Sequence, residues 1–264
     1  MRRIALSLIV LCLALSSLAF ADEWSKTYQI NGQPDLRVQT SDANIQVDTW
    51  DQNNIEARVT TESMKIGDGG LKILESQTGN SVVLDVRFPH TYFSINFHIP
   101  HVTVQIHMPR EGKVALRTGD GDIRLSQFKG SMDLRSGDGS LEVDGVDGTF
   151  HARTSDGHIR VSGRFDQLDL GTGDGRIEAR ATTGSTVASD WDVQTGDGRV
   201  TLQLPDNLAA NIELHTGDGH ITLGLPVTVE GQMDKKDIRG KLNGGGERNI
   251  SVHTGDGSIR VEKS

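Results

Sequence analysis

The chain has 264 residues, with 27 Lys and Arg against 36 Asp and Glu and a formal net charge of −9. This acidic balance argues against DNA or RNA as a partner, because nucleic acids bind clustered basic side chains, and against charge-driven attachment to anionic lipid. The only cysteine is Cys12, so disulfides do not hold this fold together.

Residues 1–21 have the pattern of a secretory signal peptide. Arg2 and Arg3 form a positive start, an apolar run follows over 4–15, and the small-x-small site Ala19–Ala21 precedes Asp22. The apolar run is too short to span a bilayer comfortably. We therefore predict an exported protein, periplasmic or extracellular, without a transmembrane segment after cleavage.

Residues 22–113 are predicted to be a β-rich but less regular N-terminal part of the same domain. Strands are expected at 54–60, 81–87 and 101–108, and no amphipathic helix is evident. Asp42 centres a degenerate copy of the repeat described next, and Gly67-Asp68-Gly69 is a weaker echo of it. The aromatic segment Phe88–Pro100 suits an apolar plug over an open end of a stack, with a binding loop as the alternative.

Residues 114–264 contain a four-residue phrase seven times: Thr or Ser, then Gly (once Ser), then Asp, then Gly. The first four copies are 18 residues apart. Apolar residues alternate on both sides of each copy, as in Met132 and Leu134 before Asp138 and Leu141 and Val143 after it, which predicts strand, tight corner, strand. The predicted turn residues are Asp120, Gly121, Asp138, Gly139, Asp156, Gly157, Asp174, Gly175, Asp197, Gly198, Asp218, Gly219, Asp256 and Gly257.

At each corner we expect Gly to supply a positive φ and Asp to bond its own backbone. In the alternation of each strand, the Thr and Ser side chains fall at positions that point inward. We therefore interpret their hydroxyls as corner hydrogen-bonding groups and not as nucleophiles. They are Thr118, Ser136, Thr154, Thr172, Thr195, Thr216 and Thr254.

A fixed period indicates stacked units. The predicted fold class is all-β: a β-solenoid, similar to a parallel β-helix, of about seven to eight strand-GDG-strand units. Separate β-hairpins are the alternative, because Asp-Gly is also a hairpin signal.

Stacking at this period has consequences for the outward residues. Arg124, Glu142, Arg160 and Glu178 should become neighbours of alternating sign. Arg117, Arg135 and Arg153 should stack like on like, with the Asp column beside them to offset the repulsion. The stretch 225–249 is expected to be a polar loop between the last two units.

The phrase TGDG with alternating apolar residues, together with the closing segments Ile238–Gly246 and Thr254–Val261, resembles the bacterial putative-adhesin family of exported β-strand-repeat proteins, long catalogued as a domain of unknown function. The resemblance covers most of the chain after residue 21. It implies an exported all-β solenoid and supplies no catalytic residues.

The repeated Asp residues raise the possibility of calcium, for which Asp138, Asp156 and Asp174 are the candidates because of their regular spacing. We interpret them instead as turn-forming residues and predict no metal, cofactor or catalytic site. His98, His101 and His107 lack zinc-site spacing, and His215 and His253 hold equivalent repeat positions in units that are not adjacent in sequence.

The predicted function is non-enzymatic and adhesin-like: an acidic β-solenoid surface presented to an unidentified protein or glycan. Two alternatives stay open, a β-helix-type enzyme acting on polysaccharide and a calcium-stabilised structural protein. A single coil whose outward residues form a carboxylate cleft would favour the enzyme.

Overall fold

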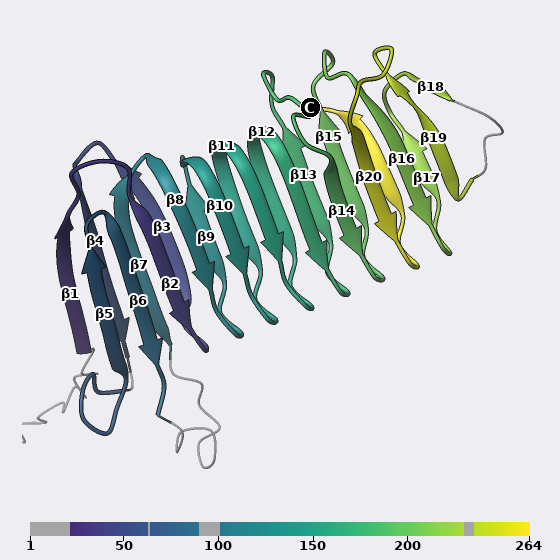
Figure 1. The fold of residues 1–264 in the computed structure, drawn as a ribbon. Helices are drawn as coiled ribbons and strands as arrows, with labels where there is room; N and C mark the ends of the chain where they lie inside the picture. The colour runs from purple at the N-terminus through teal and green to yellow at the C-terminus, as the bar shows by residue number, and fades with distance from the viewer. Residues whose placement is uncertain (1–21, 63, 90–100, 230–234) are drawn as a thin grey trace, which may run out of the picture.

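A computed structural model of the chain describes residues 22–62, 64–89, 101–229 and 235–264. Every regular element in these residues is a β-strand, and no helix occurs among them. The strands lie side by side in an elongated stack, with the tight bends aligned along one edge (Figure 1). The prediction of an all-β fold is confirmed.

Two hydrogen-bonded ladders run along the stack. Ladder A contains the strands that precede the bends, and ladder B contains those that follow them. The long strands β11 (Leu141–Arg153) and β12 (Ile159–Thr172) contribute their first halves to ladder B and their second halves to ladder A.

The remaining strands of ladder A are, in spatial order, β5 (Lys72–Thr78), β6 (Ser81–Arg87), β2 (Asp35–Thr40), β8 (Glu111–Arg117) and β10 (Lys129–Arg135) before the two shared strands, then β14 (Trp191–Thr195), β20 (Asn249–Thr254), β16 (Ala210–Thr216), β19 (Asp237–Leu242) and β18 (Val227–Val229). From β6 to β16 every pairing is parallel.

Ladder B begins with β1 (Asp22–Gln29), β4 (Asn54–Thr61), β7 (Val102–Pro109), β3 (Asn44–Trp50) and β9 (Ile123–Ser126), and after the shared strands continues with β13 (Ile177–Ala181), β15 (Val200–Leu204), β21 (Ile259–Lys263) and β17 (Ile221–Leu223). From β7 to β17 every pairing is again parallel. The strands expected at 54–60, 81–87 and 101–108 correspond to β4, β6 and β7.

The hydrophobic core lies between the two ladders. Alternate side chains of each strand point inward, so equivalent residues of successive units pair in register, as Met132 does with Phe150 and Leu134 with Ala152. These side chains are fully buried or nearly so. Burial of one such Leu or Phe contributes about 1.5–3 kcal/mol, and Phe165 meets Trp191 edge to face with ring centroids 6.2 Å apart.

Chain order and stack order differ at both ends. Strands β20 and β21 close the chain, yet they lie between β14–β15 and β16–β17. Likewise, β2 and β3 lie between β6–β7 and β8–β9. The expectation that each unit stacks on the one before it in sequence therefore holds only in the middle of the chain.

Antiparallel strands cover both ends of the stack. At the N-terminal end, β1 and β5 are joined by an ion pair between Lys26 Nζ and Glu75 Oε1 at 2.6 Å and by the Gln77 amide, which donates to the Gln29 carbonyl at 2.8 Å. Charged side chains on such edge strands discourage pairing with another chain.

At the C-terminal end, β19 pairs antiparallel with β16, and β18 pairs with β19. The prediction of a polar loop over 225–249 was wrong for these strands. Ile238 and Leu242 alternate inward and are buried, but the apolar pattern is too short to be recognised alone, because Gly240 holds the inward position between them. The predicted signal peptide and residues 90–100 of the aromatic segment lie outside the described residues.

Candidate functional site

The bends bring one Asp from each unit into a single line. This aspartate row consists, in stack order, of Asp42, Asp120, Asp138, Asp156, Asp174, Asp197, Asp256 and Asp218. Adjacent members belong to neighbouring parallel strands, which are about 4.8 Å apart. All are exposed except Asp42, which is partly buried.

Hydroxyl groups lock each bend to its neighbour. Ser136 Oγ donates to the Gly121 carbonyl of the adjacent unit at 3.0 Å and accepts from the Gly139 amide of its own bend, also at 3.0 Å. The same pair of contacts recurs at Thr154 and, along the stack, in every later unit. The buried polar groups of these bends are thereby satisfied, which limits the cost of removing them from water. The bend at Asp42 differs, because Thr40 Oγ1 is buried there without a hydrogen-bond partner among the described residues.

The bends also differ from the prediction in one respect: their glycines do not have positive φ. A Cβ atom built on Gly139 would overlap the Gly121 carbonyl oxygen of the adjacent unit and lie 2.8 Å from Ser136 Oγ. Glycine is therefore needed for the close approach of successive backbones, not for a left-handed conformation. Positive φ occurs instead at the weaker echo, where Gly67 has φ 117° and Gly69 has φ 77°, in a local loop that belongs to neither ladder.

The expected bond from each Asp carboxylate to its own backbone is not among the hydrogen bonds of the described residues. The amide of Asp138 instead donates to the Gly119 carbonyl of the adjacent unit at 3.1 Å. The carboxylates of the six central members, Asp120 to Asp256, have neither an ion pair nor a hydrogen bond with any described residue. At the C-terminal end, Asp218 pairs with Lys236 Nζ at 2.9 Å.

Asp42 is the member of the row with the most restricted solvent access. Its Oδ2 atom is buried without a hydrogen-bond partner in the described part of the chain. Burial, and to a lesser extent the neighbouring charge of Asp120, raise the pKa of Asp42 above its ordinary value. The charged form of Asp42 is therefore less favourable than that of the exposed members of the row.

The outward face of ladder B has the predicted alternation of charge. Arg124 Nε lies 3.3 Å from Glu142 Oε2, and Arg160 Nη2 lies 3.0 Å from Glu178 Oε2. These pairs are solvent-exposed, so each contributes well under about 1 kcal/mol.

On ladder A the like-charged column of Arg117, Arg135 and Arg153 is present. The counter-charges come from the same face, contrary to the expectation that the aspartate row would supply them. Asp133 lies 3.7 Å from Arg117 and 3.0 Å from Arg135, and Asp169 pairs with Arg153 at 2.5 Å. The aspartate row is left without these cations.

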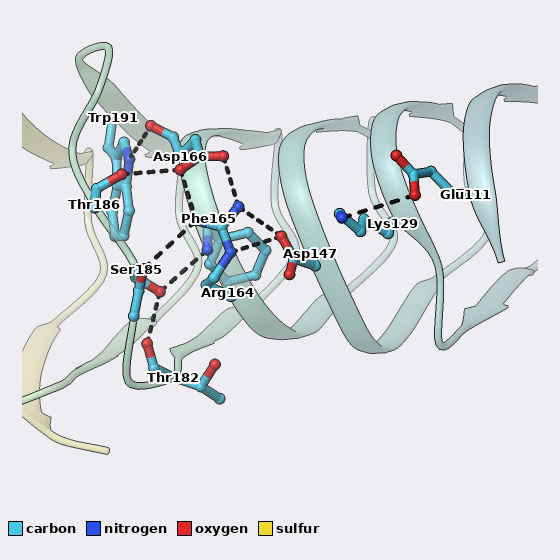
Figure 2. Close-up of polar contacts among 11 residues, drawn as sticks. Glu111, Lys129, Asp147, Arg164, Phe165, Asp166, Thr182, Ser185, Thr186 and Trp191 are labelled. Carbon is cyan, nitrogen blue, oxygen red and sulfur yellow. Dashed lines mark hydrogen bonds and ion pairs between the residues drawn. The ribbon is translucent and has the colours of Figure 1, made fainter. Parts of the chain in front are cut away.

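The corner opposite the bends contains an ionic cluster that the sequence did not reveal (Figure 2). Phe165 stands 18 residues after Asp147, the spacing of the repeat, but a register shift in the pairing of β11 with β12 places Arg164 beside Asp147 instead. Arg164 donates to Asp147 Oδ1 at 2.6 Å and to both oxygens of Asp166 at 2.7 Å, and Thr186 donates to Asp166 at 2.9 Å. Those hydrogen bonds lower the pKa of Asp166 and raise that of Arg164.

This cluster anchors a local loop. Residues 182–190 lengthen the repeat between Asp174 and Asp197, and Ser185 fixes the loop by donating to the Thr182 carbonyl at 2.8 Å and accepting from the Phe165 amide at 3.1 Å. The arginine, threonine and two carboxylates satisfy one another. The arrangement is therefore that of a structural clamp.

A comparison with models of protein families identifies the family of the chain. The family model described as Toastrack DUF4097 matches residues 25–262. The chain belongs to this family. The resemblance inferred from the TGDG phrase is thus confirmed over nearly the whole of the described structure.

Solved structures similar to this Toastrack chain include a putative cell adhesion protein from Clostridium sporogenes, with 14% identity and a TM-score of 0.42 over 92% of this chain and 99% of that one. A putative adhesin from Bacteroides fragilis has 8% identity and a TM-score of 0.44 over 90% and 96%. One from Parabacteroides merdae has 13% identity and a TM-score of 0.37 over 92% and 97%. No curated protein matches the chain.

The described part of this Toastrack chain contains no group of three or more His, Cys, Asp or Glu side chains arranged to hold a metal ion. The calcium candidates Asp138, Asp156 and Asp174 lie on three successive units, in one line and not around a common point. Of the histidines considered for zinc, His98 lies outside the described residues and His107 stacks on Trp50 with ring centroids 5.3 Å apart. No helix in the described residues has the length and apolar character needed to cross a bilayer.

Proposed function

We propose that this Toastrack chain is an exported, non-enzymatic and adhesin-like module, built as a β-solenoid of about seven to eight stacked units. In this proposal residues 1–21 direct export and are removed, and the aspartate row is the surface that contacts a protein or glycan partner in the periplasm or outside the cell. No cofactor is required.

The observation that carries the proposal is the run of six exposed carboxylates along consecutive bends, none of which has a counter-ion among the described residues. Like charges one strand apart repel, so a partner that donates hydrogen bonds or positive charge to the row relieves that repulsion. The hydroxyl ladder already fixes the bend backbone. Binding of a partner therefore loses little conformational entropy in the bend backbone, which favours affinity.

The uniformity of the row supports binding over catalysis. A catalytic centre requires a carboxylate whose surroundings differ from those of its neighbours, together with groups that orient a substrate. Here the same four-residue bend, with the same hydroxyl contacts, recurs from unit to unit. Repetition suits a partner that is itself extended and repetitive.

The test compares two variants of equal charge. In the row variant, Asp138, Asp156 and Asp174 are each changed to Asn. In the control, three exposed acids elsewhere are neutralised: Glu62→Gln, Asp68→Asn and Glu247→Gln.

Binding is measured on arrays of bacterial and host glycans and against purified envelope proteins. We expect the row variant to lose at least ten-fold in affinity for any ligand of the unmodified chain, while the control keeps it. Equal losses in both would show that only net charge matters. Unchanged binding by the row variant would refute the role of the row.

Export is tested separately by cell fractionation and N-terminal sequencing. We expect the exported chain to begin at Asp22. A cytoplasmic chain that retains residues 1–21 would overturn this part of the proposal.

A further inference from the structure

The insertion of the last unit into the stack brings two distant histidines together. His215 in β16 and His253 in β20 are 38 residues apart in sequence, yet they pair directly in a parallel register. Their units are not adjacent in chain order, so repeat spacing alone did not predict this contact. Their rings stack with centroids 4.8 Å apart and planes inclined by 12°.

An aspartate stands on the far side of this pair. Asp237 in β19 pairs in register with His215, and its Oδ2 lies 3.5 Å from His215 Nδ1. A carboxylate at Nδ1 favours the tautomer with the proton on that nitrogen, which leaves the Nε2 lone pair free to bind a metal. The side chain of His215 is 48% exposed, so an ion can reach it from solvent.

We propose that His215 and His253 form a two-imidazole site for a divalent transition ion of the Zn²⁺, Cu²⁺ or Ni²⁺ class. Water completes the coordination, and Asp237 acts as the positioning residue for His215. Imidazole nitrogens are preferred ligands of these ions and poor ligands of Ca²⁺ or Mg²⁺. This proposal does not depend on the function proposed for the aspartate row.

Shared binding of one ion requires both imidazole rings to reorient. Two imidazole nitrogens bound to one ion at about 2.0–2.1 Å in tetrahedral geometry are about 3.4 Å apart. In the stacked arrangement the ring planes are inclined by only 12°, so the in-plane lone pairs point in nearly the same direction, and both rings must rotate out of the stack to direct them at one ion. Rotation of two solvent-accessible side chains can supply this movement without disturbing the strands.

The surroundings also suit a cation. The two rings border a shallow hollow of about 160 Å³ that is lined by Glu213, Asp237, Arg239 and Ser251 as well as by the histidines. Its two carboxylates outweigh the single guanidinium. Arg239 is partly neutralised by Asp237, whose Oδ1 lies 3.8 Å from its Nε.

The first experiment titrates the untagged, purified exported chain with Zn²⁺ and follows heat release by calorimetry. We expect one ion per chain, and at least a ten-fold loss of affinity in His215→Gln and in His253→Gln. The matched control is His158→Gln, which removes an exposed imidazole on a bend. Circular dichroism verifies that each variant is folded.

A second measurement needs no variant. Substoichiometric Cu²⁺ is added to the unmodified chain, and the paramagnetic broadening of each histidine ring signal is recorded by NMR. We expect the rings of His215 and His253 to broaden first and together. Equal broadening of all histidines, or Zn²⁺ affinity unchanged by both substitutions at the pair, would overturn the proposal.

Discussion

Replacement of Gly139 by alanine tests the structural reason for the repeated phrase. The Cβ of alanine would overlap the Gly121 carbonyl oxygen and approach Ser136 Oγ to 2.8 Å. The first of these contacts is with backbone, so no side-chain rotation can relieve it. Two neighbouring bends must separate.

The magnitude follows from the hydrogen bonds that join the bends at this point. They are Ser136 Oγ to the Gly121 carbonyl at 3.0 Å, the Gly139 amide to Ser136 Oγ at 3.0 Å, and the Gly137 amide to the Gly119 carbonyl at 2.5 Å. A typical bond of this kind contributes about 0.5–1.5 kcal/mol. Loosening of all three predicts a loss of about 2–4 kcal/mol, and Gly139→Val should cost at least as much.

The assay is equilibrium unfolding in urea, followed by circular dichroism. Gly139→Asn separates overlap from backbone conformation, because Asn tolerates a left-handed φ better than Ala does. If overlap with the Gly121 carbonyl is the cause, Gly139→Asn should lower the free energy of unfolding at least as much as Gly139→Ala does. A control at Gly79, which has φ 59° and open space around it, should lose about 1–2 kcal/mol as Ala and less as Asn. If Gly139→Ala cost under about 1 kcal/mol, or if Asn were clearly milder than Ala, glycine would not be needed at this bend for the close approach of the two backbones.

Further outcomes are expected elsewhere in the stack. Thr154→Val should lower the free energy of unfolding by about 1–3 kcal/mol, because the buried Gly157 amide loses its acceptor, while Thr154→Ser should be nearly neutral; equal effects in urea melts would contradict this. Asp42→Asn should raise the melting temperature at pH 7, because its raised pKa makes the charged form unfavourable in the fold, and the gain should disappear below about pH 3.8, where both states are protonated. Asp166→Asn should have the opposite sign: its lowered pKa supplies stability that is present above its ordinary value and lost as the pH falls through the lowered one, so the variant should melt lower at pH 7 and approach the unmodified chain in acid. Removal of calcium with a chelator should leave the melting temperature unchanged, because bend carbonyls that could ligate Ca²⁺ already accept Thr and Ser hydroxyls; a clear drop would restore the calcium hypothesis.

Sequence reasoning succeeded where the signal is local. Alternation with a period of two identified the inward residues Met132, Leu134, Leu141 and Val143, all of which are buried. The outward pair Arg124 and Glu142 was also predictable, because an unbroken 18-residue spacing in this stretch places equivalent residues side by side.

Contacts between segments that are distant in the sequence could not be predicted in this way. Arg164 replaces Phe165 beside Asp147 because a register shift interrupts the period. The contact of His215 with His253 depends on a strand that returns from the chain end. Neither feature has a marker within a short window of residues.

The amino-acid order alone determined that this is an all-β chain of the Toastrack family, because strand alternation and the TGDG phrase are read within one unit. Only the tertiary structure decided why the phrase needs glycine, which units are neighbours, and which aspartates find no counter-ion in the described part of the chain. These properties arise from contacts between backbones and side chains of different units. A repeat period in the sequence predicts such contacts only where its spacing is unbroken. In this chain the loop at 182–190 lengthens the spacing, and at both ends of the stack the units are not in chain order.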